Sequence, residues 1–200
     1  MKPLDEIIQL VNSISAGSEY KENKRKNIFI HVKTHHCLII HSGVFSIYRE
    51  SDGLFLSHHS GPMILGLNMI AETTGVYMKT LIQVSVEYVE LDQSIKRIYD
   101  HALWEQLAHY YMYLTYLLRQ GYCSLVGHSV KEVIINCLIK LKSEDKKIRN
   151  NISALIYVME KSNLSRSSVF KHFALLKKSD ALRIKKGMLE SFTDESMDFS

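Results

Sequence analysis

The order of apolar, polar and glycine positions in residues 151–192 constrains the fold of this chain more than any other feature, because it predicts two helices followed by a hairpin. The first helix is expected over about 152–159, where four apolar residues recur at the i, i+3, i+4, i+7 spacing of a buried face: Ile152, Leu155, Ile156 and Met159. Lys161-Ser162-Asn163 then interrupts the pattern, and Leu164 is expected to fill the turn. The segment therefore predicts a helix-turn-helix.

Ser165 marks the start of the second helix, because its hydroxyl can accept a hydrogen bond from a backbone N–H two or three residues later. Val169, Phe173 and Leu176 fall on the inner face of that helix. Five polar side chains are expected to point outward: Arg166, Ser167, Ser168, Lys171 and His172. A helix whose exposed first turns carry Arg, Ser and Lys suits the major groove of DNA, where Arg can form two hydrogen bonds to guanine. We predict that Ser165 and these five residues bind DNA.

A basic hairpin, or wing, is expected to follow, since the runs 182–184 and 188–190 flank Lys185-Lys186-Gly187. Lys185 and Lys186 at its tip would contact phosphates. Residues 165–190 hold seven Lys or Arg against two acidic residues, whereas the whole chain has a net charge of only +4. Basicity confined to one segment is expected of a DNA-binding module, because phosphate contacts release counterions. The alternative is a small helical domain with a solvated lysine face, but the agreement of helix spacing, cap, turn and wing favours DNA binding.

Residues 28–91 have the pattern of a β-domain, with short β-rich runs separated by turn residues such as Ser51-Asp52-Gly53. Several short strands at this spacing indicate an antiparallel sandwich or β-roll rather than a parallel sheet. The predicted strands cover 28–33, 36–41, 44–49, 54–59, 77–84 and 86–91. A leading helix would pack on the roll through Leu4, Ile7, Ile8, Val11 and Ile14. We expect one β-roll domain over residues 1–99.

A long helix is expected over 102–120, which contains neither glycine nor proline. One stripe alternates steps of four and three and is predicted to be a coiled-coil dimer seam: Leu103, Leu107, Tyr110, Leu114 and Leu117. A second stripe lies beside it, so the helix has more apolar surface than one roll can cover: Trp104, Ala108, Tyr111, Thr115 and Leu118. Burial of the whole helix within a monomer is the alternative, since two heptads alone rarely settle oligomeric state. We assign residues 100–122 to this dimerisation helix, which Gly121 is expected to end or bend.

The remaining segment, 123–200, is predicted to be the DNA-binding domain. It begins with an amphipathic helix over 129–142, whose apolar positions are Val130, Val133, Ile134, Cys137, Leu138 and Leu141. Residues 143–151 are polar enough to be a connecting loop. The fold expected for the whole chain is α+β: an N-terminal antiparallel β-roll, a long dimerisation helix and a C-terminal winged helix-turn-helix.

Composition favours a globular protein, with 46% hydrophobic residues, two prolines and 23% charged residues. No apolar run approaches the ~20 residues needed to cross a bilayer, and the first residues lack a secretory apolar segment. A cytoplasmic location without a membrane partner is therefore expected. Cys37, Cys123 and Cys137 are widely separated and odd in number, which argues against a disulfide framework or a paired-cysteine metal site.

The order of β-roll, long helix and winged helix-turn-helix over about 25–192 resembles the family of the catabolite activator protein and FNR. The most specific part is Ser165-Arg166-Ser167-Ser168-Val169 with the following Lys171. The resemblance implies a jelly roll like a cyclic-nucleotide-binding domain, and base contacts by Arg166, Ser167 and Lys171. It also implies double-stranded DNA, a second copy of the chain and RNA polymerase as partners. The chain is similar to the enterobacterial IprA (YaiV) group of these regulators, which implies a role in the response to hydrogen peroxide.

Cyclic nucleotide binding is not expected, because two motifs of the family are missing. Members that bind cyclic AMP hold the ribose with a Gly-Glu pair and the phosphate with an Arg-Ser pair, but residues 64–68 and 74–77 contain neither. A buried phosphate without a charge-assisted partner is unfavourable. The cysteine cluster of FNR is absent too, and three separated cysteines cannot supply four thiolates to an iron–sulfur centre. The sequence predicts no cofactor.

Six histidines crowd the β-region: His31, His35, His36, His41, His58 and His59. They leave open an alternative function, in which a cupin-like roll binds a metal or haem as a sensor or an enzyme. No Asp or Glu occupies 31–49 and adjacent histidines face opposite sides of a strand, so surface or strand-end positions are favoured.

Cys37, next to one of these histidines, is a candidate redox thiol if its pKa is lowered, and burial as a small strand residue is the competing interpretation. No nucleophilic triad or phosphate-cradling glycine loop points to catalysis, so an enzyme is not expected.

Overall fold

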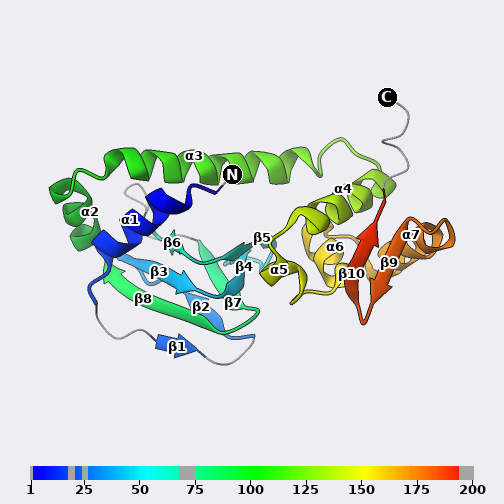
Figure 1. The fold of residues 1–200 in the computed structure, drawn as a ribbon, viewed down its shortest axis with the longest axis horizontal. Coiled ribbons are helices and arrows are strands. Elements are labelled where there is room, and N and C mark those ends of the chain that lie inside the picture. Colours follow the sequence, from blue (N-terminus) through cyan, green and yellow to red (C-terminus); the bar gives the residue numbers. More distant parts are fainter. Residues whose placement is uncertain (1, 18–20, 24–26, 68–74, 194–200) are drawn as a thin grey trace. The chain divides into compact units, whose positions relative to one another are not determined.

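The structure is a computed structural model that describes residues 2–17, 21–23, 27–67 and 75–193. The chain divides into two compact units, Met1–Arg119 and Gln120–Ser200. One 20-residue helix, α3 (Trp104–Cys123), runs from the first unit into the second. The elements of both units are labelled in Figure 1.

Two four-stranded antiparallel sheets form the β-roll of the N-terminal unit, which confirms the predicted class of fold. The strands of the first sheet are, in spatial order, β1 (Lys21–Asn23), β8 (Val84–Glu90), β3 (His36–Ser42) and β6 (Met63–Leu65). Those of the second are β2 (Phe29–His31), β7 (Val76–Thr80), β4 (Val44–Arg49) and β5 (Phe55–Ser60). Leu38 and Ile40 of the first sheet share one apolar core with Phe45, Ile47 and Met78 of the second, so the two sheets enclose a common interior.

The strand predictions need two corrections. The strand expected over 77–84 ends at Thr80, because the N–H groups of Leu81 and Ile82 both donate to the carbonyl oxygen of Val44, at 2.8 and 3.3 Å, and end the pairing of β7. β1 and β6 were not predicted, because a strand of three residues is too short to show a period of two.

The first helix, α1 (Leu4–Ile14), packs on the roll with a face that differs from the predicted one. Leu4 and Ile8 are 46% and 39% exposed, whereas Leu10, which was not predicted, is buried with Ile7, Val11 and Ile14. A second helix that the sequence did not predict, α2 (Leu91–Asp100), packs against α1. Figure 1 shows α1 beside α2 and the sheet that contains β6.

The predicted dimer seam on α3 packs instead against the roll of its own chain. Leu103, Leu107 and Tyr110 are 9%, 8% and 1% exposed and belong to the core of the N-terminal unit. The Tyr110 hydroxyl donates to the carbonyl oxygen of Ile64 at 2.5 Å and accepts from the Ile64 N–H at 3.2 Å. A buried tyrosine needs such partners, and these fix which side of α3 faces the roll. The assignment of Leu103, Leu107 and Tyr110 to a dimer seam was therefore wrong.

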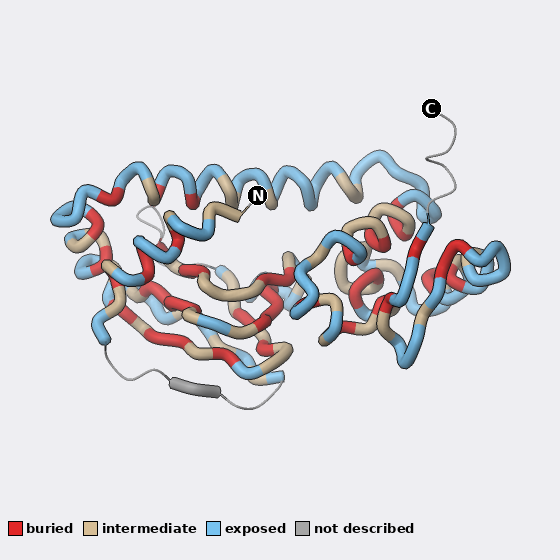
Figure 2. Tube along the Cα trace, viewed as in Figure 1, coloured by how far each residue is buried: buried red, intermediate tan, exposed pale blue. Residues whose placement is uncertain are grey.

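The rest of α3 follows from that orientation. Leu114 packs against the same core and Leu117 is half-buried, so neither offers an exposed seam. All five side chains of the second stripe are exposed in one chain, and we call them the outer stripe: Trp104, Ala108, Tyr111, Thr115 and Leu118. Figure 2 shows that exposed residues make up most of α3. Gly121 does not end the helix, which continues to Cys123.

The C-terminal unit is a three-helix core with a hairpin. Its elements are α4 (Val130–Ser143), α5 (Lys146–Arg149), α6 (Ala154–Ser162), α7 (Arg166–Lys178), β9 (Leu182–Lys185) and β10 (Met188–Phe192). A capping box starts α4, in which Ser129 Oγ accepts from the Glu132 N–H and the Glu132 carboxylate accepts from the Ser129 N–H. The core of this unit combines α4, α6 and α7, as expected of a winged helix-turn-helix.

Two details of this unit differ from the sequence prediction. The polar segment 143–151 contains a helical turn, α5, because Asp145 caps it by accepting from the Lys147 N–H at 2.7 Å. The buried face of α6 consists of Ala154, Tyr157 and Val158, whereas Ile156 is 50% exposed. Of the predicted apolar face, Ile152 is buried just before the helix and Leu155 and Met159 are half-buried, whereas the placement of Ile156 was wrong.

Candidate nucleic-acid interface

Ser165 positions α7 by capping its first turn, as predicted. Its Oγ accepts from the Ser168 N–H at 3.2 Å, which satisfies one of the N–H groups that a helix start leaves without a partner. Asn163 ends the preceding helix in the left-handed conformation with φ +54°, a region that asparagine tolerates better than most residues. Ser162 stabilises the turn between these two capping residues, because its Oγ accepts a hydrogen bond from the Leu164 N–H at 3.3 Å. These local contacts set the turn between α6 and α7.

The outer side of α7 carries polar residues that the sequence predicted to be exposed. Val169 and Phe173 are 0% and 3% exposed and anchor the inner side, while Arg166, Ser167 and Lys171 are exposed. The major-groove contacts expected of a recognition helix come from exposed side chains of its first turns.

Two of the predicted contact residues are less accessible. Ser168 and His172 are half-buried, and His172 Nδ1 lies 2.9 Å from the Ser168 carbonyl oxygen. That hydrogen bond holds the imidazole against the backbone of the helix, and both side chains are less exposed than the sequence predicted.

The wing is a two-residue hairpin. Lys186 and Gly187 have φ +51° and +85°, the left-handed pair that such tight turns favour, and Lys185 pairs with Met188 across it. Lys185 and Lys186 are exposed, as predicted. The Gly187 carbonyl accepts from the Ala154 N–H at 2.9 Å, so the tip of the wing is joined to the first residue of α6.

A buried polar group supports this framework from inside. The Tyr157 hydroxyl donates to Glu144 Oε1 at 2.7 Å, and Lys161 Nζ lies 5.3 Å from the centre of the Tyr157 ring. Burial lowers the pKa of Lys161, and burial with the neighbouring Glu144 carboxylate raises the pKa of Tyr157. No pattern in the sequence indicated this contact, because Tyr157 and Lys161 were expected outside the apolar face of the helix.

The surface also presents residues that the sequence reasoning missed. Phe170 is 48% exposed on α7, and its ring lies 5.3 Å from the guanidinium carbon of Arg166. Lys177 and Lys178 are exposed on the same helix. The sequence did contain a signal for the contact between Arg166 and Phe170. The two residues are four positions apart and neither belongs to the buried face of the helix, and side chains at this spacing are neighbours on a helix.

The histidines of the roll do not converge. Among the residues that the structure describes, no group of three or more His, Cys, Asp or Glu could hold a metal ion. His31 lies 3.1 Å from Glu50 and His41 lies 3.1 Å from Glu87. His58 and His59 are 5% and 8% exposed, which corrects the prediction of surface or strand-end positions. Both are tied to serines, His58 Nδ1 to Ser46 Oγ at 2.9 Å and His59 Nε2 to Ser57 Oγ at 2.6 Å.

The cysteines fall into two kinds. Cys37 and Cys137 are 0% and 2% exposed, and burial raises the pKa of each thiol to about 11. A reactive cysteine needs a lowered pKa and access to solvent, so the surroundings of Cys37 favour the interpretation of a buried strand residue over that of a redox thiol. Cys123 is exposed near the end of α3.

The segment that corresponds to a nucleotide site is only partly described. Leu65 and Leu67 are buried, and the Tyr111 hydroxyl donates to the carbonyl oxygen of Leu67. Of the two stretches compared with the cyclic AMP motifs, 64–68 and 74–77, Asn68 and Thr74 lie outside the described residues.

Residues 131–195 match the family of winged helix-turn-helix DNA-binding domains. The c-di-GMP responsive global regulator CLP of Xanthomonas campestris has a similar structure, with a TM-score of 0.71 at 15% identity over 94% of this chain and 100% of that chain. A transcriptional regulator of the CRP family from Thermus thermophilus aligns with a TM-score of 0.64 at 15% identity, over 88% of this chain and 93% of that chain. The chain has the fold of the CRP/FNR regulators.

The sequence is also similar to curated proteins from enterobacteria. The inhibitor of hydrogen peroxide resistance of Escherichia coli K12 is 24% identical over 194 residues, which cover 94% of this chain and 93% of that protein. The protein of the same name from Salmonella typhimurium is also 24% identical, over 195 residues. None of the described helices combines the length and the apolar character needed to cross a membrane.

Proposed function

We propose that this protein is a sequence-specific DNA-binding transcription regulator that acts as a homodimer. The observation that carries the proposal is the exposure of polar and basic side chains on α7 and on the wing that follows it. Arg166, Ser167 and Lys171 are exposed on a helix whose start is capped by Ser165, and the exposed Lys185 and Lys186 lie in the hairpin that follows. A DNA duplex is the partner that fits both a polar recognition helix and a basic wing.

The two elements would make different contacts. Arg166 can give two hydrogen bonds to guanine O6 and N7 in the major groove, and Ser167 and Lys171 can bond neighbouring bases or phosphates. Ser165 and Ser168 lie at the N-terminus of α7, where a phosphate is favoured by the helix dipole. Lys185 and Lys186 would neutralise phosphates without regard to sequence. His172, which is held against the helix, is the weakest of the predicted contacts.

The outer stripe of α3 is the dimer surface that we propose in place of the predicted seam. Its residues recur at steps of four, three, four and three, which is the spacing of a coiled coil. Trp104, Tyr111 and Leu118 are 41%, 41% and 73% exposed in one chain. A two-fold dimer would place its two α7 helices against half-sites about one DNA turn, ~34 Å, apart. RNA polymerase is a further partner that a regulator of this kind would engage.

The regulator is proposed to act without cyclic AMP in the response to hydrogen peroxide and to work in the cytoplasm. Residues 64–68 and 74–77 lack the carboxylate and the guanidinium that would hold the ribose and the phosphate. The peroxide role is supported by the relatives named inhibitor of hydrogen peroxide resistance. Calorimetric titration with cyclic AMP should give no heat of binding, and micromolar affinity would overturn this part of the proposal.

Selection from a pool of randomised DNA duplexes tests the central proposal. The full chain is expected to enrich a two-fold symmetric sequence and to bind it in fluorescence anisotropy with an affinity that falls steeply as salt rises. No enrichment, or equal affinity for the enriched and scrambled duplexes at every salt concentration, would refute sequence-specific binding. An enriched site without two-fold symmetry would refute the dimer.

A further inference from the structure

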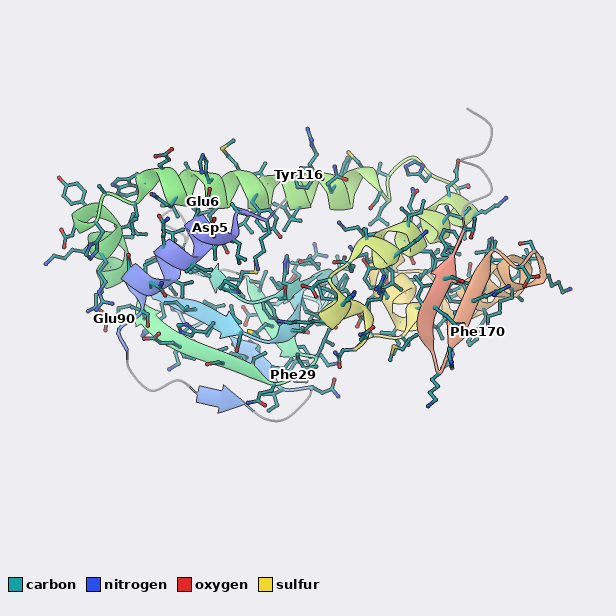
Figure 3. The ribbon with its side chains drawn as sticks, viewed as in Figure 1. Asp5, Glu6, Phe29, Glu90, Tyr116 and Phe170 are labelled. Carbon is teal, nitrogen blue, oxygen red and sulfur yellow. The ribbon has the colours of Figure 1, made fainter. Side chains whose placement is uncertain are left out.

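Phe170 is a large apolar side chain on the outer part of α7. It is 48% exposed, in contrast to its neighbour Val169 and to Phe173 one turn later, which are 0% and 3% exposed. The label in Figure 3 marks its place in the C-terminal unit. Phe170 therefore does not serve the core of this unit, although it lies in the middle of the helix proposed to enter the major groove.

The ring of Phe170 contacts the side chain of Arg166. The two residues are four positions apart, which places them on the same side of a helix, one turn apart and ~6 Å along its axis. The guanidinium carbon of Arg166 lies 5.3 Å from the ring centre, within the range of a cation–π contact. Such a contact limits the rotamers of Arg166 and places its donors beside an apolar surface.

Exposed cations on the same helix indicate what covers this ring. Lys171, Lys177 and Lys178 are all exposed on α7, so a partner that contacts this side of the helix must accept several positive charges. A DNA major groove does so, and it offers one apolar group, the 5-methyl group of thymine. Because the Phe170 ring has no hydrogen-bonding group, this methyl group is the base feature that it can recognise in the major groove.

We propose that Phe170 contacts the 5-methyl group of a thymine close to the guanine bound by Arg166, so that the two side chains recognise both bases together. This inference rests on the proposed function. Successive bases of one strand are ~3.4 Å apart along the duplex. The 5.3 Å between guanidinium and ring therefore matches a thymine one or two steps from the guanine. Phe170 is a specificity-determining residue in this arrangement, and Arg166 supplies the hydrogen bonds.

Replacement of thymine by deoxyuridine tests the contact, because it removes the methyl group and leaves the hydrogen-bonding edges unchanged. Each thymine of the selected duplex is replaced in turn, and affinity is measured by anisotropy for the wild type and for Phe170→Ala. The wild type is expected to lose about fourfold in affinity per half-site at one thymine near the essential guanine, the factor for one buried group of methyl size. Phe170→Ala should bind the thymine duplex more weakly and should not distinguish it from the deoxyuridine duplex.

Leu175→Ala is the matched control, since Leu175 is an apolar residue of the same helix with 56% exposure and is turned away from Phe170 by five positions. This variant should keep the wild-type preference for thymine. Circular dichroism should give the same melting temperature for Phe170→Ala as for the wild type, because the side chain lies on the surface.

The outcomes separate this inference from the function on which it rests. Equal affinity of the wild type for thymine and deoxyuridine at every position would overturn the methyl contact while leaving DNA binding intact. Retention of the thymine preference by Phe170→Ala would overturn it as well, because another residue would then make the contact. Failure of the wild type to select any duplex would instead refute the proposed function.

Discussion

The Ala154 N–H donates a 2.9 Å hydrogen bond to the carbonyl oxygen of Gly187. Ala154 is the first residue of α6, where N–H groups have no partner within the helix, and Gly187 closes the turn of the wing. One bond therefore satisfies a helix end and fixes the wing to the helix-turn-helix. The spacing of the proposed base contacts and phosphate contacts depends on this junction.

Gly187→Ala should destabilise the protein by about 1–2 kcal/mol, because a Cβ at φ +85° is sterically unfavourable. Affinity for all DNA sequences should fall together, since the wing lysines lose their fixed position. Urea unfolding and anisotropy measure the two effects. Gly121→Ala is the control: its Cβ meets no atom within 4 Å in α3, and we expect a gain of roughly 0.5–1 kcal/mol. A Gly187→Ala variant as stable as wild type would contradict the role of the turn.

Leu118→Glu should convert a dimer into a monomer, because it places a charge in the outer stripe at a residue that is 73% exposed in one chain. Light scattering should give twice the chain mass of 23.1 kDa for the wild type and a single chain mass for the variant.

Tyr116→Glu is the matched control for that experiment. Tyr116, labelled in Figure 3, is 45% exposed on the same helix but lies outside the outer stripe. This variant should remain dimeric. A wild type that is monomeric at micromolar concentration, with or without DNA, would refute the outer stripe as an interface.

Cys123 should be the thiol that reacts first with a chromogenic disulfide reagent in the native protein at pH 7.5. Cys37 and Cys137 have a pKa of about 11, so on the order of one thiol in three thousand is ionised, and both are buried. Cys123→Ser should abolish the fast phase, and denaturant should then release two slow thiols. A fast phase that persisted in Cys123→Ser and disappeared in Cys37→Ser would restore Cys37 as the redox candidate.

Local signals in the sequence predicted the winged helix-turn-helix well. The Ser165 cap and the glycine of the wing act through contacts within a few residues, so their chemistry is visible in the sequence itself. Longer strands such as β3, β4 and β5 were predicted for the same reason, since turn residues bound them, whereas the three-residue strands β1 and β6 were not.

Contacts between distant residues could not be predicted in this way. Two apolar stripes lie side by side on α3, and their spacing does not say which one faces the roll; the bonds of Tyr110 to the backbone of Ile64 decide it. Likewise, the face of α6 depends on Tyr157, whose hydroxyl finds Glu144 across the unit. A tyrosine can be buried when its hydroxyl has a hydrogen-bond partner. The spacing of apolar residues along the sequence does not reveal a partner that is distant in the chain.

Arg166→Ala and the wing variants Lys185→Ala and Lys186→Ala should weaken DNA binding in different ways. Loss of the guanidinium removes a two-bond contact to guanine, so Arg166→Ala should cost about 1–3 kcal/mol on the selected duplex and leave scrambled duplexes nearly unaffected. Specificity should relax at the guanine. Each wing variant should instead weaken binding to all duplexes and reduce the slope of log affinity against log salt by about one, because it removes one phosphate contact.

Anisotropy on selected and scrambled duplexes across a salt series separates these effects within one experiment. The exposed Lys131 of α4 provides a control, since Lys131→Ala removes a charge from the same unit but outside α7 and the wing. It should change the salt slope by much less than one. If Arg166→Ala and the wing variants lost affinity equally on both duplexes, α7 would contact only phosphates, and the placement of Arg166 against a base would be wrong.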